Sequence, residues 1–409
     1  MSDHARIEPS AARRPTVTLP SAATEPPAGR RARRLPAIGF GLGAVGFGVS
    51  GLLAGDGARF YASYLVAWLF ATSIALGGLF FVLLHHATRA GWSAVLRRLA
   101  EHLAATMPLL ALLFVPVALG LERLYPWARP EAAADPLLAA KSAWLEPGFF
   151  LARAAVVLGA WSLLAWWFRR RSLAQDATGD PAISRRLKAL AAPALIVFGL
   201  TLTVGAFDWI MSLEPHWYST IFGVYFFAGS VVAVFATLIL LALAARPVLG
   251  EVVTAEHFHD LGKLLFAFVV FWAYIAFSQF MLIWYGNLPE ETLWYAHRTG
   301  PGWEGATVAL AAGHFVLPFF FLLSRAVKRR APTLVAGAVW MLAMHYLDLY
   351  WLVMPSLDPA GLRPHALDAA TLVAVVGFGA GAFGLLMRRR ALVPVRDPRL
   401  PESLSFENV

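Results

Sequence analysis

Residues 217–244 read WYSTIFGVYFFAGSVVAVFATLILLALA and contain no charged side chain. A membrane-spanning helix needs about 20 predominantly apolar residues to cross the hydrocarbon core of a bilayer, which is about 30 Å thick. A helix is the expected conformation, because a backbone in lipid must satisfy its own hydrogen bonds and this stretch lacks the alternation of a barrel strand. The segment therefore predicts a membrane-spanning helix.

Nine further apolar runs lie on either side of this one. They are at about 36–54, 60–84, 103–121, 148–168, 189–212, 262–285, 305–325, 332–354 and 367–387. Only 14% of the residues are charged, whereas soluble domains carry about 25% charged residues. We therefore predict an all-α integral membrane protein with about ten transmembrane helices in a membrane domain at 35–390. The flanking segments, 1–34 and 391–409, are predicted to be a disordered basic tail and a C-terminal tail.

The basic residues indicate the orientation of these helices. Of the 34 Lys and Arg residues, Arg153 lies inside a span and six lie in the loops on the side away from the N-terminus; the rest lie on the N-terminal side. Those six are Arg59, Arg123, Arg129, Lys141, Arg298 and Arg363. Because Lys and Arg concentrate in cytoplasmic loops, both chain ends are predicted to be cytoplasmic. The net charge of +9 then reflects topology, and we expect no nucleic-acid partner.

The sequence contains no cysteine. This excludes cysteine-ligated iron–sulfur clusters, c-type haem attachment and disulfides within this chain. A haem b group would need two histidines near mid-membrane on facing helices, and His314 and His345 are the only mid-span candidates. We expect no metal and no covalently bound cofactor in this chain.

Two predicted spans carry an acid inside the membrane, where an ionisable group costs on the order of 2.5–3.5 kcal/mol on insertion scales. Asp208 lies near the end of one span, and Glu214 and His216 follow it. The other span carries His345 and Asp348 on one helical face. A carboxylate beside an imidazole can hold the ring in one tautomer and pass protons through it. These residues predict a proton path or a polar ligand pocket.

Three further polar positions leave alternatives open. His314 precedes Pro318 by four residues, and this proline is expected to kink the helix beside a water-lined cavity, although a lone histidine is more often a packing residue. Arg153 either extends its guanidinium to the interface or pairs with a carboxylate or an anionic ligand group. His85 and His86 end a span at the cytoplasmic face, where we expect solvated side chains.

Two helix endings resemble each other. Met211-Ser-Leu-Glu-Pro215 and Met354-Pro-Ser-Leu-Asp-Pro359 both follow an intramembrane aspartate, in helices that run in the same sense. The repeat favours a parallel duplication of a four-helix unit, with bundles at about 60–212 and 217–354. The first and last spans are glycine-rich and are expected to pack on these bundles or on another subunit. Their glycines include Gly39, Gly43, Gly46, Gly377, Gly381 and Gly384.

Three longer stretches resemble a known family. They are residues 207–229, FDWIMSLEPHWYSTIFGVYFFAG, residues 276–289, AFSQFMLIWYGNLP, and residues 348–355, DLYWLVMP. Through them the chain after its tail resembles the F subunits (quinone-binding subunit 2) of bacterial alternative complex III, which belong to the NrfD/PsrC-like membrane proteins. The resemblance implies two four-helix bundles with flanking helices, in agreement with the repeated endings.

The resemblance also implies a function. Complexes of this kind oxidise quinol, either menaquinol or ubiquinol, and pass electrons to a cytochrome c or an associated terminal oxidase. The implied partners are a sister NrfD-like membrane subunit, an iron–sulfur subunit and c-type cytochrome subunits in the bacterial cytoplasmic (inner) membrane, surrounded by its lipid. Carried onto this sequence, the candidates for a proton path are Asp208, Glu214, His314, His345 and Asp348. The candidates for a quinol headgroup pocket are Asp208, His216, Trp209 and Arg153.

Two other functions stay open. A purely structural subunit of the same complex would use its polar side chains only for contacts between helices. A secondary transporter would also combine internal duplication with charges near mid-membrane. Transporters need broken helices around the substrate site, however, and no corresponding pair of predicted spans is interrupted by Gly or Pro.

Overall fold

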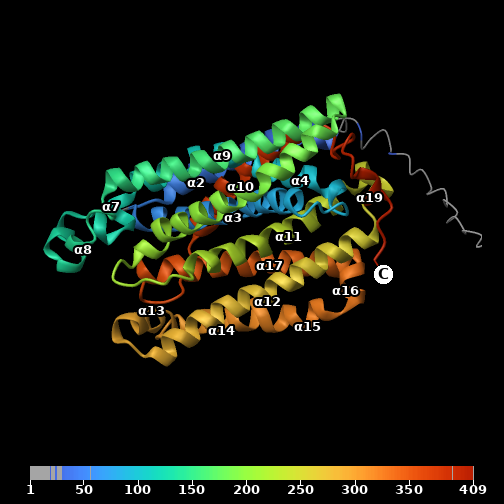
Figure 1. Ribbon diagram of the computed structural model, residues 1–409. Coiled ribbons are helices and arrows are strands. Elements are labelled where there is room, and N and C mark those ends of the chain that lie inside the picture. Colours follow the sequence, from blue (N-terminus) through green and yellow to red (C-terminus); the bar gives the residue numbers. More distant parts are fainter. Residues whose placement is uncertain (1–18, 20–23, 25–29, 56, 389, 409) are drawn as a thin grey trace, which may run out of the picture.

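The computed structural model describes residues 19, 24, 30–55, 57–388 and 390–408. All regular secondary structure in that part of the chain is helical. The long helices lie side by side, with the short helices of the connections at their two ends (Figure 1). One end holds α16 (Arg325–Arg329) and α19 (Leu400–Leu404), and the other holds α8 (Pro136–Ala140) and α13 (Pro289–Thr299).

Nine helical stretches within the described residues are long and apolar enough to cross a membrane. They are α2 (Arg30–Leu53), α3 (Ala58–Ala87), the α4–α6 stretch (Ala94–Leu119), α9 (Pro147–Thr178), α10 with its final turn (Pro181–Leu213), α11 (Phe222–Leu249), α12 (Ala255–Gly286), the α14–α15 stretch (Glu304–Leu323) and α18 (Ala366–Met387). Each of these stretches coincides with a predicted span. The prediction of an α-helical, multi-pass membrane protein is confirmed to this extent.

The tenth predicted span coincides with α17 (Ala331–Val353). Its 23 residues are enough to cross a bilayer, but its most apolar stretch is less apolar than those of the other nine, because His345, Asp348 and several aromatic side chains interrupt it. α17 packs against both α3 and α11. That α17 also crosses a membrane is part of the function that we propose.

Local sequence sets the bounds of the α9–α10 hairpin. Glu146 caps the start of α9, because its carboxylate accepts two backbone N–H groups at 2.6 and 2.9 Å. Gly179 ends α9 by taking a left-handed conformation with φ +70°. Asp180 then caps α10 by accepting a backbone N–H at 2.8 Å. The two helices turn back on each other and pack together.

The core is built around α3. This helix contacts α4 (Ala94–Ala104), α10, α11, α17 and α18. In its most apolar window 83% of the residues are buried, against 28% for α12. α3 is therefore an interior helix, whereas α12 lies at the periphery of the helical body.

The glycine-rich helices α2 and α18 pack directly on each other. A Cβ atom on Gly46 would lie 2.5 Å from the backbone nitrogen of Ala374, and one on Gly377 would lie 2.6 Å from that of Gly43. Only residues without a side chain permit such close backbones. The prediction that these helices pack on the bundles or on another subunit missed this mutual contact, which joins the first and last long helices.

Where the structure describes them, parts of both predicted tails are helical or packed on the rest of the protein. Most of the N-terminal tail, 1–34, lies outside the described residues, but α2 already begins at Arg30. In the C-terminal tail, Leu392 and Val393 are buried, and α19 packs on α4. The described part of the C-terminal tail is thus packed on the helical body.

Candidate functional site

One buried polar cluster lies where several helices converge. It consists of His314 from a π-helical turn (Ala311–Val316) and of His345 and Asp348 from α17. Each side chain is at most 2% exposed. One ligand-type nitrogen from each imidazole and one carboxylate oxygen all lie within 4.8 Å of one another. The structure thus brings three of the predicted proton-path residues together.

Asp348 is bonded only to neutral donors. The hydroxyl of Tyr225 on α11 donates to one carboxylate oxygen at 2.6 Å, and Nε1 of Trp272 on α12 donates to the other at 3.1 Å. No cationic side chain in the described part of the chain forms an ion pair with Asp348. Its charge in the ionised form is therefore met by two hydrogen bonds and by no opposite charge.

His345 has one bonded and one free ring nitrogen. Its Nε2 lies 2.8 Å from the hydroxyl oxygen of Ser73, which itself donates to the carbonyl of Phe70 at 2.8 Å. Because the hydroxyl uses its one hydrogen there, it accepts from His345, and Nε2 carries the ring proton. Nδ1 keeps a free lone pair and has no hydrogen-bond partner among the described residues. Gly229 on α11 faces it, since a Cβ there would lie 3.0 Å from Nδ1.

His314 lies in the π-helical turn of the α14–α15 stretch, at the place where the sequence predicted a kink. π turns insert one extra residue into a helix and are frequent at functional sites. The imidazole stacks on the indole of Trp272, with 3.7 Å between ring centroids and 24° between planes. Neither ring nitrogen has a described hydrogen-bond partner. His314 is therefore buried with its full hydrogen-bonding capacity unused.

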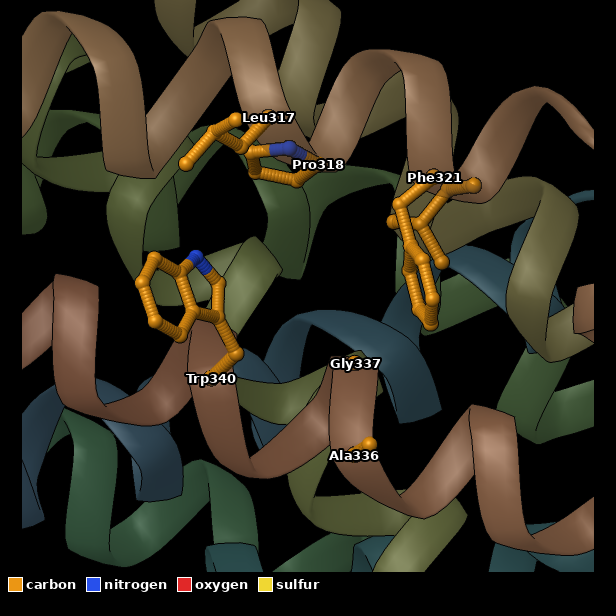
Figure 2. Close-up of a pocket in the computed structure, with 7 residues that line it drawn as sticks. Leu317, Pro318, Phe321, Ala336, Gly337 and Trp340 are labelled. Carbon is orange, nitrogen blue, oxygen red and sulfur yellow. The ribbon is translucent and has the colours of Figure 1, made fainter.

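Trp340 ties α17 to this turn. Pro318 has no N–H with which to reach the carbonyl of Gly313, five residues earlier, and Nε1 of Trp340 donates to that carbonyl instead at 2.7 Å. The same indole lines an apolar groove of about 360 Å³ between α15 (Leu317–Leu323) and α17 (Figure 2). Since its one polar side-chain group is already bonded, the groove suits an apolar chain and offers nothing to a quinol headgroup.

The central cluster also has the ligand types of a divalent metal site, two imidazoles and a carboxylate. It is the one such group of three found within the described residues. Both oxygens of Asp348 are already used as hydrogen-bond acceptors. The expectation that the chain holds no metal stays a prediction.

Asp208, a second buried acid among the predicted proton-path residues, lies in an ion pair. Arg153 on α9 donates through Nε and Nη2 to its two oxygens at 2.7 and 3.0 Å. Nε1 of Trp144 donates to one of them at 3.0 Å. The guanidinium lies over the rings of Trp144 and Phe149, at 4.1 and 4.4 Å from their centroids. Of the alternatives left open for Arg153, the structure has the pair with a carboxylate.

The four quinol-pocket candidates do not form one pocket. Trp209 packs edge-on against Trp68 in the core, with 4.9 Å between centroids. His216 is exposed, and its Nε2 lies 2.7 Å from a carboxylate oxygen of Asp135. Only Asp208 and Arg153 lie together; both oxygens of Asp208 are bonded, whereas Nη1 of Arg153 has no hydrogen-bond partner among the described residues.

Glu214 joins the ends of three helices. Nη1 of Arg298 on α13 donates to one carboxylate oxygen at 2.6 Å, and Nδ1 of His297 lies 3.0 Å from the other. Arg298 also donates to the carbonyls of Trp351 and Leu352 at the end of α17, at 3.2 and 2.9 Å. Burial lowers the pKa of the Arg298 guanidinium, and the charge of Glu214 opposes this shift. Glu214 thus anchors α13 to α10 and α17.

Both repeated helix endings form a 3-10 turn. η3 (Met211–Leu213) follows α10, and η6 (Met354–Ser356) follows α17. Residues from both endings line one pocket of about 530 Å³, together with Glu214, His216 and His297. This pocket combines prolines and aromatic rings with acids and imidazoles. It lies at the end of the molecule that holds α13.

Sequence reasoning missed a second cluster of buried charges. Arg97, Arg98 and Glu101 on α4 are all at most 3% exposed. Glu101 lies within 3.6 Å of both arginines, and Arg98 donates to Asp176 on α9 at 2.6 Å. The run Arg-Arg-Leu-Ala-Glu, which begins at residue 97, could have indicated this cluster. The predicted span 103–121 starts after this run and so did not include it in a helix.

Comparisons with known proteins do not assign a family. No protein-family model matches the chain, and no curated protein matches it. The resemblance carried by the three sequence stretches is therefore neither supported nor opposed by these comparisons.

Proposed function

We propose that this chain is a proton-conducting membrane subunit of a quinol-oxidising complex of the alternative complex III type. The observation that carries the proposal is the burial of Asp348 beside His345 with no cation to neutralise it. An unpaired acid inside a membrane protein is costly and indicates a functional site, of which a proton relay is one established kind. The kind of complex is inferred from the three sequence stretches that resemble subunits of alternative complex III.

The cluster has the parts of a short proton relay. The free lone pair on Nδ1 of His345 can accept a proton while Nε2 releases one towards Ser73, so that a proton crosses the ring. The separation of up to 4.8 Å between the ligand-type atoms is one that a single bridging water can span. Such a water would lie between Asp348 and His314, which are the proton donor and acceptor in this proposal.

In the proposed arrangement all ten long segments, α17 included, cross a bacterial cytoplasmic membrane with both ends inside. α9 contacts α10, α3 and α4, and α10 also contacts α3, whereas α11 packs on α12 and α17 as well as on α3. These contacts favour bundles of the second to fifth and the sixth to ninth spans. The redox metals would belong to iron–sulfur and cytochrome partners, because the chain has no cysteine to hold such groups.

A quinol headgroup is best placed in the pocket between the two repeated endings. His216 and His297 each use one ring nitrogen on a carboxylate, and the second ring nitrogen of each bonds no described residue, whereas both oxygens of Glu214 are already engaged. Asp208 has no free acceptor for it, because Arg153 and Trp144 already donate to its two carboxylate oxygens. The ion pair between Arg153 and Asp208 is also the observation that favours the alternative function, a purely structural subunit.

The complex is tested by purification in a mild detergent with an affinity tag on this chain. We expect a multihaem c-type cytochrome, an iron–sulfur protein and a second membrane subunit of the same family to copurify. Recovery of the chain alone, together with binding of a soluble solute, would favour a transporter and contradict the proposal.

The proton role is tested with His345→Gln in that complex. Gln keeps an N–H donor for Ser73 but cannot carry a proton across a ring, so quinol-dependent proton release is expected to fall at least tenfold while the complex still assembles. Wild-type proton release in this variant would leave only the structural role. Arg186→Gln, an exposed position on α10, is the matched control.

A further inference from the structure

A separate pocket of about 220 Å³ lies at the end of the molecule that holds α19. Its walls come from the end of α3, from α4, from the start of α10 and from the segment that precedes α19. Five of the lining side chains are cations and one is a carboxylate: Arg89, Arg97, Arg185, Lys188, Arg399 and Asp397. Four parts of the chain thus bring positive charge to one cavity.

The charge in this pocket is not balanced within the described part of the chain. Asp397 is paired with Arg97, and Arg399 lies 3.5 Å from Glu402. Arg89 and Arg185 are exposed and Lys188 is half-buried, and none of the three takes part in an ion pair among the described residues. The other pairs of the protein show that its arginines find carboxylates where these are within reach, as Arg329 does with Glu256 at 2.5 Å. Three cations therefore remain for an external anion.

A buried histidine faces the same cavity. His86 lines the pocket, is only 7% exposed and has no hydrogen-bond partner at Nε2. This corrects the expectation that His85 and His86 are solvated, since both are buried at the end of α3. A buried ring nitrogen without a partner is uncommon, because burial removes the water that would otherwise bond it. An anion in the pocket would supply the missing acceptor for an Nε2–H.

We propose that this pocket binds a phosphoryl anion. Guanidinium groups match the oxygens of phosphate with paired N–H donors, and lysine adds a point charge. Basic pockets between membrane helices on the cytoplasmic side bind the headgroups of anionic lipids. The phosphate belongs either to an anionic phospholipid of the surrounding leaflet or to a small soluble phosphate. This site is independent of the central cluster and of the proposed redox complex.

The test uses the full chain, freed of native lipid in a nonionic detergent. Native mass spectrometry measures the retention of dioleoyl phosphatidylglycerol, of dioleoyl phosphatidylcholine and of inorganic pyrophosphate. We expect the protein to retain phosphatidylglycerol in preference to phosphatidylcholine, which has the same chains and no net charge. Arg185→Gln should weaken this retention about fivefold, and Arg185→Gln with Lys188→Gln by about 25-fold.

The neighbouring residue provides the control. Arg186 is exposed, carries the same charge and does not line the pocket, so Arg186→Gln should leave retention unchanged. Equal losses in Arg185→Gln and Arg186→Gln, or no loss in the double variant, would overturn the proposal, because general surface charge would then explain binding. Competition by pyrophosphate supports the site and identifies a soluble phosphate; retention of phosphatidylglycerol without such competition identifies a lipid headgroup. An unchanged unfolding temperature shows that each variant is folded.

Discussion

The two buried acids Asp208 and Asp348 occupy similar places before the two repeated helix endings, yet they have opposite surroundings. Asp208 on α10 is held by Arg153 through two hydrogen bonds. Asp348 on α17 is held by a phenol and an indole, both neutral. Removing one partner of a buried ion pair leaves a bare charge, whereas removing a neutral donor does not. The same residue type is therefore structural at one site and a proton carrier, in our proposal, at the other.

The largest expected effect comes from removing the cation of the closed pair. Arg153→Met leaves Asp208 buried without its cation, and the free energy of unfolding should fall by about 3–5 kcal/mol. Arg153→Met combined with Asp208→Leu should recover most of this loss, because both charges are gone. Thermal unfolding in detergent measures both variants. Equal stability of the single and double variants would show that the pair is not what holds α9 to α10.

Asp→Asn at each acid gives the sharpest contrast. Asp348→Asn should lower quinol-dependent proton release more than tenfold, because an amide cannot release a proton, while stability falls by only about 1 kcal/mol through one weakened hydrogen bond. Asp208→Asn should instead destabilise the protein and leave proton release per assembled complex near the wild-type value. Proteoliposomes with a trapped pH dye measure the release. If both substitutions abolish it equally, the two sites do not differ in function.

Gly229→Ala tests the packing around His345 and Asp348. A Cβ there would lie 2.9 Å from Cε1 of His345, so the ring has to move, at a cost of about 1–3 kcal/mol. Gly199→Ala on α10 is the matched control, because its Cβ would meet nothing within 4 Å. That control should be neutral or slightly stabilising. Similar unfolding temperatures for both variants would mean that His345 is not confined as described.

The smallest expected effect is at the π turn. Trp340→Phe keeps the aromatic wall of the groove but removes the donor to the carbonyl of Gly313, which should lower stability by about 1 kcal/mol. Hydrogen exchange should rise in residues 311–316 and stay unchanged around Asp208. Unchanged exchange in the π turn would show that the indole is not needed to hold it.

Much of the architecture could be predicted from the sequence, whereas the partners within the sites could not. In the part of the chain that the structure describes, apolar runs placed nine helices that are long and apolar enough to span, and a tenth whose most apolar stretch is less apolar. Tyr225 and Trp272 gave no signal, because in the sequence they are ordinary aromatic residues of apolar helices. Arg97 and Glu101 were missed because a charged turn before an apolar run is typical of a loop, yet here the turn is helical and buried.

The sequence by itself determined where the long helices run and which of them carry an acid, since apolar runs and charge are local properties of the chain. Only the tertiary structure decided what each acid meets. Arg153 is 55 positions from Asp208, and Tyr225 is 123 positions from Asp348. Such contacts depend on which faces of the helices pack against each other. The spacing of apolar residues along one helix does not specify its neighbour. The difference between a closed ion pair and an open acid therefore arises from helix packing.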